Sequence, residues 1–505
     1  MHKGTTFRQF RFDARTAIDD PFLQGAINGA TRNFHNGRVK VLADVPDVPA
    51  LRDHLKAIRA GTLAALPDYL EQFEQQATAA GAHVHWARDA AEACEIVSGI
   101  AQQHAAQRIV KSKSMASEEI HLNAALEKAG IEVVETDLGE WLIQLAGETP
   151  SHIIGPALHK TRQQIAELMS EKTGKTLSAD DIPGLTAEAR RVLREKFLAA
   201  DIGISGANLG VAETGSVVLV TNEGNGRLVT GAPPVHIAIM GIEKVCPTWD
   251  DAAAWLSLLA RSATGQPLSI YTTAITGPAQ AEDADGPREL HIVLLDNGRS
   301  DLLGGKYEEV LQCIRCGACL NVCPVYQTVG GHSYGAPYSG PIGAVIMPLL
   351  FGLEKYEALP HASSLCVACL EVCPARIDLP RMLLELRKDE VDQSLLSEVE
   401  EVIEKGIAWL LGHQVLFETL TNIGRVAQLP LVRSGGLAVP RELNPAGERQ
   451  LPKLAARSFH TIWENDLRED AGEQDAQPVV IAFRPWQIVL GALLLAWLLL
   501  RRKRS

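Results

Sequence analysis

Seven cysteines in two short runs are the residues of this chain whose spacing most clearly implies chemistry. In the first run, three cysteines are spaced three residues apart and a fourth follows four residues later, before a proline, in CIRCGACLNVCP at 313–324. Thiolates at this spacing can reach three corners of one cubane iron–sulfur cluster, while the fourth cysteine ligates a neighbouring cluster. The run therefore predicts two clusters held close together.

A second run supplies the partners that a two-cluster arrangement needs. CVACLEVCP at 366–374 repeats the latter part of the first run, and the last cysteine of each run is expected to cross to the other cluster. The ligands expected for the first cluster are Cys313, Cys316, Cys319 and Cys373. The ligands expected for the second cluster are Cys323, Cys366 and Cys369.

The second run is one cysteine short, because Ser363 stands three residues before Cys366 where a first cysteine would be needed. Three arrangements remain open for the second cluster. One iron could carry an oxygen or water ligand, another protein group such as His332 or His361 could bind it, or the cluster could hold only three irons. For either histidine, ordinary hydrogen bonding is the commoner role.

Other uses of the cysteines explain the pattern less well. Paired C-x-x-C motifs also bind zinc, but zinc does not explain the Cys-Pro endings or a third cysteine in each run. Disulfides are disfavoured by the tight spacing and by the lack of an export signal. The two remaining cysteines, Cys94 and Cys246, are expected to be core residues. Arg315, inside the first run, would raise that cluster's potential or face solvent.

Composition limits the class of protein. The chain has 505 residues, of which 46% are hydrophobic and 22% charged, enough for two or three globular domains. Its net charge of −13 argues against nucleic-acid binding. The N-terminus shows neither the apolar segment of a signal peptide nor a twin arginine, which predicts a cytoplasmic location.

Residues 61–300 alternate between segments with helical spacing of apolar residues and short apolar runs. The expected strands are 83–86, 108–111, 131–134, 151–154, 215–221, 235–240, 269–273 and 291–295. This alternation is typical of βαβ units and predicts an α/β domain with a mainly parallel sheet.

The remaining segments differ from this domain in composition. Residues 1–60 are predicted to be an N-terminal arm that packs on the body of the protein. Residues 304–390 hold both cysteine runs and predict an α-helical, two-cluster ferredoxin-type domain. Three further segments follow: a helical C-terminal region at 391–465, a polar linker at 466–480 and an apolar tail at 481–505.

Two loops of the α/β domain are candidate sites. KSKSMAS at 111–117 follows a strand and opens a helix, with Ser117 as candidate N-cap, which favours an anion site or simply a capped helix with exposed lysines. The glycine-rich segment 203–215 predicts tight turns and close approach of the backbone to neighbouring atoms. Within it, Glu213 is a candidate nucleophile or base, and a solvated turn residue is the alternative. No G-x-G-x-x-G follows a first strand, so no nicotinamide site is predicted.

The tail contains an uncharged apolar run at 486–500, with a tryptophan near each end and RRKR directly after it. As a helix it would span about 22 Å, less than the roughly 30 Å of a bilayer's hydrocarbon core. The basic residues favour the cytoplasmic side. We therefore expect shallow attachment to the inner face of the cytoplasmic membrane. The alternatives are a helix in the core of a soluble protein and a helix that crosses the bilayer.

With these motifs in view, the chain resembles the lactate utilisation protein B family. The resemblance covers residues 1–465 and is carried by the two cysteine runs, GGHSYG at 330–335, GPIGAV at 340–345, and KSKSM and ETGS within 70–297. That last region looks like the family's LUD domain, whose fold is similar to the α/β fold of isomerases and coenzyme A transferases. In the family the shortened second run is normal, whereas the apolar tail is not part of the pattern.

The resemblance implies an electron-transfer component of a three-protein system that oxidises L-lactate, or another 2-hydroxy acid. The implied cofactors are two 4Fe-4S clusters, the second with three cysteine ligands or in 3Fe-4S form. The implied partners are a cysteine-rich-domain protein and a second LUD-domain protein, with a quinone or other membrane acceptor. Two alternatives stay open: a LUD-domain enzyme that uses Glu213, and a redox-sensing iron–sulfur scaffold.

Overall fold

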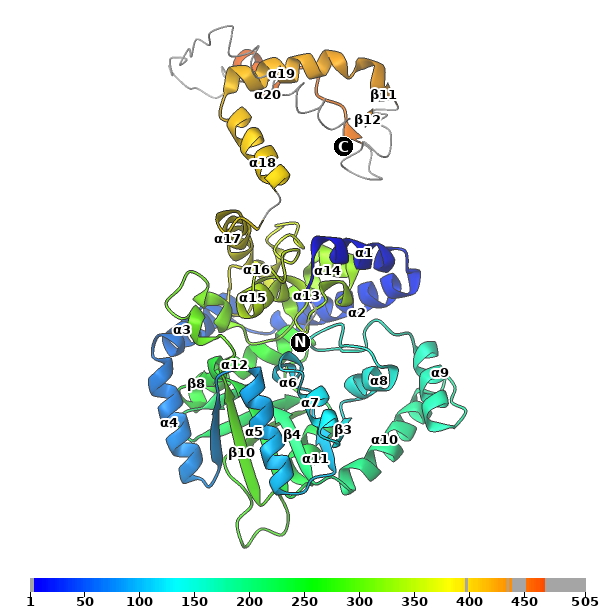
Figure 1. Cartoon of the computed structure of the whole chain (residues 1–505), viewed down its shortest axis with the longest axis vertical. Helices are drawn as coiled ribbons and strands as arrows, with labels where there is room; N and C mark the ends of the chain where they lie inside the picture. The colour runs from blue at the N-terminus through cyan, green and yellow to red at the C-terminus, as the bar shows by residue number, and fades with distance from the viewer. Residues whose placement is uncertain (1–3, 396–397, 434–435, 438–450, 468–505) are drawn as a thin grey trace. The chain divides into compact units, whose positions relative to one another are not determined.

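The computed structural model describes residues 4–395, 398–433, 436–437 and 451–467 (Figure 1). The chain forms two compact units, Met1–Leu396 and Ser397–Ser505. The first contains the α/β domain and both cysteine runs.

The centre of the first unit is a six-stranded sheet in which every neighbouring pair is parallel. In sheet order the strands are β1 (His83–Ala87), β10 (Glu289–Leu295), β7 (Val235–Gly241), β4 (Ile202–Gly206), β2 (Arg108–Lys111) and β3 (Glu132–Glu135). All seven residues of β7 are buried, as expected for a parallel strand covered on both faces. The predicted α/β domain with a mainly parallel sheet is confirmed.

Helices cover both faces of this sheet (Figure 1). Side chains alternate between faces along a strand, so the neighbours Ile109 and Val110 of β2 enter different cores. The core around Ile109 includes apolar residues of α5 (Ala90–Gln103) and α7 (Leu122–Lys128). The core around Val110 includes residues of α8 (Leu138–Ala146), α9 (Arg162–Thr173) and α10 (Ile182–Leu198).

A second sheet contains a segment that the sequence suggested was a loop. Its order is β8 (Val245–Cys246), β5 (Leu209–Val211), β6 (Ser216–Thr221) and β9 (Tyr271–Ile275). Most of β4 and all of β5 fall in the glycine-rich stretch 203–215, where no strand was expected, while residues 212–215 form the predicted turn. The glycines permit close packing: a Cβ at Gly203 would lie 1.9 Å from the carbonyl oxygen of Val229. The strand expected at 151–154 is also absent, since these residues form bends.

The N-terminal residues expected to form an arm are three helices, α1 (Phe7–Ile18), α2 (Pro21–Leu42) and α3 (Val48–Ala64). Asp20 and Asp47 cap the second and third by accepting hydrogen bonds from first-turn N–H groups, and a proline stands in the first turn of each. Helix α2 packs on α13 (Ala318–Val322) and α14 (Pro324–Val329), and α3 packs on η3 (Glu308–Gln312). These helices therefore lie directly against the cysteine-bearing region.

The cysteine-bearing region is built from short helices. After α14 come α15 (Gly340–Phe351), α16 (Ala368–Val372) and α17 (Leu379–Asp392). Helix α15 is buried along Gly340–Pro348 and packs on α13 and α17. The helices α13 and α16, one from each cysteine run, contact each other.

The second unit contains α18 (Glu398–Leu411), α19 (Gln414–Ala427), α20 (Phe459–Ile462) and the short strands β11 (Val432–Arg433), β12 (Gly436–Leu437) and β13 (Leu451–Pro452). Several large apolar side chains of α18 and α19 are exposed, including Ile407, Trp409 and Ile423. Within the described part of the chain, no helix is long and apolar enough to span a bilayer. The apolar tail at 481–505 and most of the linker at 466–480 lie outside the described residues.

The close approach at Gly203 gives a stability prediction. Gly203→Ala should lower the free energy of unfolding by about 1–3 kcal/mol, because the added methyl group meets backbone that cannot rotate away. Gly61→Ala is the matched control: Gly61 lies inside α3 with nothing within 4 Å of a Cβ, so it should gain about 0.5–1 kcal/mol. Chemical unfolding monitored by circular dichroism tests both, and equal stability of the two variants would contradict the packing described.

Candidate iron–sulfur centre and adjoining cavity

The two cysteine runs have the same backbone conformation. Arg315 and Gly317 in the first run have φ of +57° and +73°, and the equivalent Leu365 and Val367 in the second have +54° and +69°. Left-handed φ is uncommon for residues other than glycine, and for a β-branched valine it is a marked outlier. Strain kept at equivalent positions of two loops indicates that both loops serve the same purpose.

This backbone turns N–H groups toward sulfur. The N–H groups of Arg315, Tyr326 and Ile377 donate to the Sγ atoms of Cys313, Cys323 and Cys373 at 3.4, 3.5 and 3.4 Å. Such N–H···S bonds stabilise thiolate charge and tune the potential of an iron–sulfur cluster.

Electrostatic influence divides the thiols into the two expected sets. Burial raises the pKa of Cys319 well above its usual value, and the charges of Cys313 and Cys316 add to this. Burial and then the charge of Cys323 raise the pKa of Cys369 to about 12. Each thiol therefore lies near members of its own set. The charge of Cys369, which belongs to the other set, also raises the pKa of Cys319.

The donor set fits two iron–sulfur clusters. All seven cysteines are free of disulfides. Burial raises the pKa of Cys316 to about 12 and that of Cys373 to about 11, so these thiols are protonated at neutral pH unless a metal binds. Metal coordination deprotonates a thiol outright. The first cluster would be held by Cys313, Cys316, Cys319 and Cys373, and the second by Cys323, Cys366 and Cys369.

Ser363 occupies the place in the second loop that Cys313 occupies in the first. Its Oγ accepts a hydrogen bond from the N–H of Leu365 at 3.1 Å, as the sulfur of Cys313 does from Arg315. The two histidine candidates are engaged elsewhere: His332 Nε2 lies 2.7 Å from the carbonyl oxygen of Thr149, and His361 Nε2 lies 2.7 Å from Glu390 Oε2. Of the three, only the serine is placed as a fourth ligand would be.

Five cations surround the first set of cysteines. Arg52 donates to the carbonyl oxygen of Cys373 at 2.7 and 3.0 Å, and Lys244 donates to that of Cys313 at 2.6 Å. The negative charge of one or more of these thiolates favours the protonated form of each of the five cations, which are Arg38, Arg52, Arg59, Lys244 and Arg315. Among the described residues, no lysine or arginine is a main influence on the pKa of Cys323, Cys366 or Cys369.

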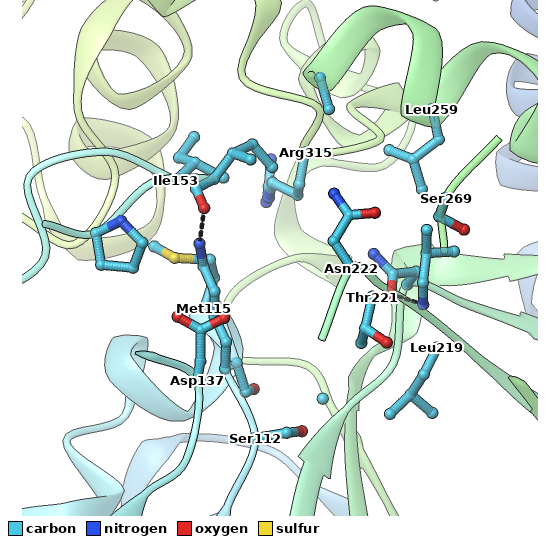
Figure 2. A pocket seen from close by; sticks show the side chains of 18 of the residues that line it. Ser112, Met115, Asp137, Ile153, Leu219, Thr221, Asn222, Leu259, Ser269 and Arg315 are labelled. Carbon is cyan, nitrogen blue, oxygen red and sulfur yellow. Dashed lines mark hydrogen bonds between the residues drawn. The ribbon is translucent and has the colours of Figure 1, made fainter. Parts of the chain in front are cut away.

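A cavity of about 490 Å³ lies beside the first cysteine set (Figure 2). It is at the carboxyl edge of the parallel sheet, the edge at which open α/β sheets bind ligands. The residues that line it after β3, β2, β4, β7 and β10 include Asp137, Lys113, Asn208, Lys244 and Arg299. Ile314 and Arg315 of the first cysteine run line it as well.

Acidic residues stand on the wall of this cavity. Burial raises the pKa of Glu223 to about 7, and the charge of Asp137 adds to the effect. A carboxyl group that titrates near neutrality in a cavity is suited to exchange protons with a ligand. Lys113, whose Nζ donates to the carbonyl oxygen of Ile154 at 2.5 Å, lies near these acids.

The structure corrects some of the expectations for the two loops singled out in the sequence and confirms others: Glu213 is an exposed turn residue, the alternative given for it, and residues 112–116 line the cavity. Lys111 is not an exposed lysine: it is fully buried, with Nζ 2.8 Å from Glu135 and 3.1 Å from Glu118. Ser114, rather than Ser117, caps the short helix that follows. Glu213 is exposed and accepts a hydrogen bond from the N–H of Trp249 at 3.1 Å. It does not line the cavity, so its position gives no support to catalysis there.

Sequence reasoning missed the cations that the N-terminal helices contribute. Arg52, Lys56 and Arg59 recur at i, i+4 and i+7, which places them on one face of α3. That periodicity was visible in the sequence, but nothing local indicated that the face would meet the cysteine region. Arg59 is completely buried and donates to the carbonyl oxygens of Val245 and Leu311.

The fold and the site define an α/β domain joined to a dicluster iron–sulfur domain. Residues 70–295 match the LUD domain family, and residues 309–377 match the 4Fe-4S dicluster domain family. A crystal structure of a DUF162 family protein from Deinococcus radiodurans covers 46% of this chain and 98% of its own, at 15% identity and a TM-score of 0.27. That likeness is too low to carry an argument.

Relatives that match most of the chain identify the family more closely. Lactate utilization protein B of Shouchella clausii is 42% identical over 459 residues, which is 90% of this chain and 96% of that protein. The proteins of the same name from Macrococcus caseolyticus and Bacillus velezensis are 42% and 47% identical, over 92% and 78% of this chain and 98% and 82% of their own. The chain belongs to the lactate utilisation protein B family.

The equivalence of Ser363 and Cys313 predicts how substitutions affect iron retention. Ser363→Cys supplies an eighth thiolate and should increase the iron that remains after brief exposure to air. Ser363→Ala removes the oxygen and should decrease it. Iron and sulfide analysis with EPR before and after exposure measures the effect.

The mirror variant serves as control. Cys313→Ser gives the first loop the side chain of the second, and should make the first cluster about as labile as the second. Identical iron loss from Ser363→Cys, Ser363→Ala and the unaltered protein would show that Ser363 does not face the cluster.

Proposed function

We propose that this protein is the iron–sulfur electron-transfer component of a system that oxidises L-lactate or a closely related 2-hydroxy acid. The observation that carries the proposal is the convergence of seven cysteines into two adjoining sets, joined by the proximity of Cys319 and Cys369. Clusters bound there would each accept and release one electron. The family membership supplies the metabolic setting, because the relatives are named for lactate utilisation.

The surroundings of the two sets imply different potentials. Positive charge favours the reduced, more negative form of a cluster, and hydrogen bonds to sulfur act in the same direction. The five cations lie about the first set, whereas the charge near Cys366 is the carboxylate of Glu371. The residues of this chain therefore favour an electron at the first set over the second.

The two sets also differ in their access to solvent. Cys366 is exposed, and the neighbouring Val367 is 40% exposed. Cys316 is buried, and Arg315 beside it lines the cavity. This arrangement suits electron exchange with a partner protein at the second set. The proposed partners are a cysteine-rich-domain protein and a second LUD-domain protein.

Membrane attachment through the apolar run at 486–500 is part of the proposal. It rests on the sequence of that run and the RRKR that follows it, and it would place the clusters near a quinone or other membrane acceptor. Deleting residues 481–505 should move the protein from the membrane fraction to the supernatant of lysed cells without changing its iron content. Unchanged fractionation would remove this part of the proposal.

The central experiment joins the purified, cluster-loaded protein with its two proposed partners under anaerobic conditions. Addition of L-lactate should produce the EPR signals of reduced clusters, as dithionite does with the protein alone. Signals that appear with dithionite but never with lactate, although lactate is oxidised to pyruvate, would show that electrons bypass this chain. Retention of lactate oxidation after loss of the clusters would favour the redox-sensing scaffold instead.

The cation arrangement predicts a shift in potential. A unit charge about 10 Å away, at an effective dielectric constant of about 20, contributes about 1.7 kcal/mol, or about 70 mV for one electron. Because Arg52 is only partly buried, Arg52→Gln should lower the midpoint potential of the first cluster by some tens of millivolts and leave the second nearly unchanged. An EPR-monitored redox titration measures both values.

Arg191→Gln is the matched control for this shift. Arg191 is 55% exposed on α10 and pairs with Glu188, so its loss should change neither potential. A shift of equal size in both variants, or a larger shift of the second cluster with Arg52→Gln, would contradict the assignment of the cations to the first set.

A further inference from the structure

We infer that the cavity at the carboxyl edge of the parallel sheet binds a small organic monocarboxylate, with the Arg315 guanidinium as the group that receives the carboxylate. The cavity is closed on one side by the first cysteine run, so the ligand would lie between the LUD domain and the first cluster. Only the identity of the acid, lactate or pyruvate, rests on the function proposed above.

Arg315 is buried without hydrogen bonds for its terminal nitrogens. Its side chain is 10% exposed, and neither Nη1 nor Nη2 has a hydrogen-bond partner. The nearest carboxylate oxygen, Glu243 Oε1, is 3.5 Å from Nη2, and the ring of Tyr338 lies 4.7 Å from Cζ. A buried donor left without an acceptor costs free energy, so the conformation favours an acceptor from outside the chain.

The neighbouring charges leave this end of the cavity positive. Arg299 is compensated by a two-point ion pair with Glu119 and by Glu243 at 2.7 Å. Lys244 and Arg315 must share the same Glu243, which lies 3.6 and 3.5 Å from them. Arg59 adds a fourth cation, and the thiolate of Cys313 acts on Arg59, Lys244 and Arg315. Four cations therefore face two carboxylates and one thiolate, an excess that one carboxylate ligand would offset.

The carboxylate groups on the cavity wall limit the ligand to an anion with a single negative charge. Asp137, Glu223 and Glu243 all line the cavity, and a phosphate dianion would meet their repulsion. A planar carboxylate also matches the fork of a guanidinium, to which it can bind through two parallel hydrogen bonds.

The cavity offers further partners for a polar substituent. Ser112, Asn222 and Ser269 line it along with the apolar Ile153, Leu219 and Leu259 (Figure 2). Its volume of about 490 Å³ is in the range of small-molecule sites. The lining therefore combines hydrogen-bonding and apolar side chains, as a site for a small polar organic acid requires.

Isothermal titration of the anaerobic, cluster-loaded full chain with three probes tests the inference. L-Lactate should bind saturably, and the neutral L-lactamide, which has the same shape, should bind at least tenfold more weakly. Inorganic phosphate should also bind more weakly than lactate. No saturable binding of L-lactate, pyruvate or acetate would overturn the inference, as would equal binding of lactamide or tighter binding of phosphate.

Two variants locate the site. Arg315→Gln should weaken lactate binding at least tenfold, and Arg315→Lys should recover part of it, whereas Arg191→Gln should bind as the unaltered chain does. Iron content shows whether each variant keeps its clusters. If a variant loses them, the comparison of lactate, lactamide and phosphate on the unaltered chain still tests the inference. Unchanged binding in a loaded Arg315→Gln would overturn the assignment of this residue.

The EPR-monitored potential of the first cluster gives a second measure, because a bound carboxylate offsets the charge of Arg315. Saturating lactate should lower that potential and leave the second unchanged, while lactamide should change neither. If lactate does not bind yet the assembled complex still reduces the clusters with lactate, the inference fails and the proposed electron-transfer function stands.

Discussion

The confinement of thiolate charge is the constraint on which this structure depends. Most of the seven cysteines are buried or partly buried, and burial raises the pKa of the thiols of Cys316, Cys369 and Cys373. Thiolates can persist there only if metal, backbone N–H groups and cations offset their charge. The loops supply N–H groups through left-handed residues, and the cations come from three separate parts of the chain.

That requirement explains why distant segments meet. Helices α2 and α3 bring Arg38 and Arg52 to carbonyl oxygens of the second run, while Lys244, just after β7, reaches the carbonyl oxygen of Cys313. The LUD domain, the N-terminal helices and the cysteine region are therefore parts of one compact unit. The same groups distinguish the two cluster sites electrostatically, since among the described residues these cations interact mainly with thiols of the first set.

The cavity follows from the same geometry. A parallel sheet directs its strand ends to one edge, and here the first cysteine run covers that edge. Glu243 and Lys244 belong to both regions, because they line the cavity and lie among the charges around Cys313. A ligand in the cavity and an electron at the first cluster would thus act on shared charges.

The sequence predicted those features that depend on local spacing. The two cysteine runs, the alternation of helices and strands and most strands of the parallel sheet could be read from it, because each is set by neighbours in the chain. The sequence did not predict features that are determined by long-range packing. The stretch 203–215 contains two strands whose glycines allow close packing, besides the turn at 212–215. Lys111 is buried by a partner, Glu135, that only the sheet brings near. The burial of Arg315, whose terminal nitrogens have no hydrogen-bond partner, and the placement of the N-terminal cations depend on long-range contacts as well.

Iron and sulfide analysis with EPR on the anaerobically purified protein shows directly whether the seven cysteines hold two clusters. Two adjacent clusters require about eight irons, or about seven if the second cluster lacks one, with magnetically interacting signals on reduction. Bound zinc with no iron, after rigorous exclusion of air, would contradict this two-cluster arrangement.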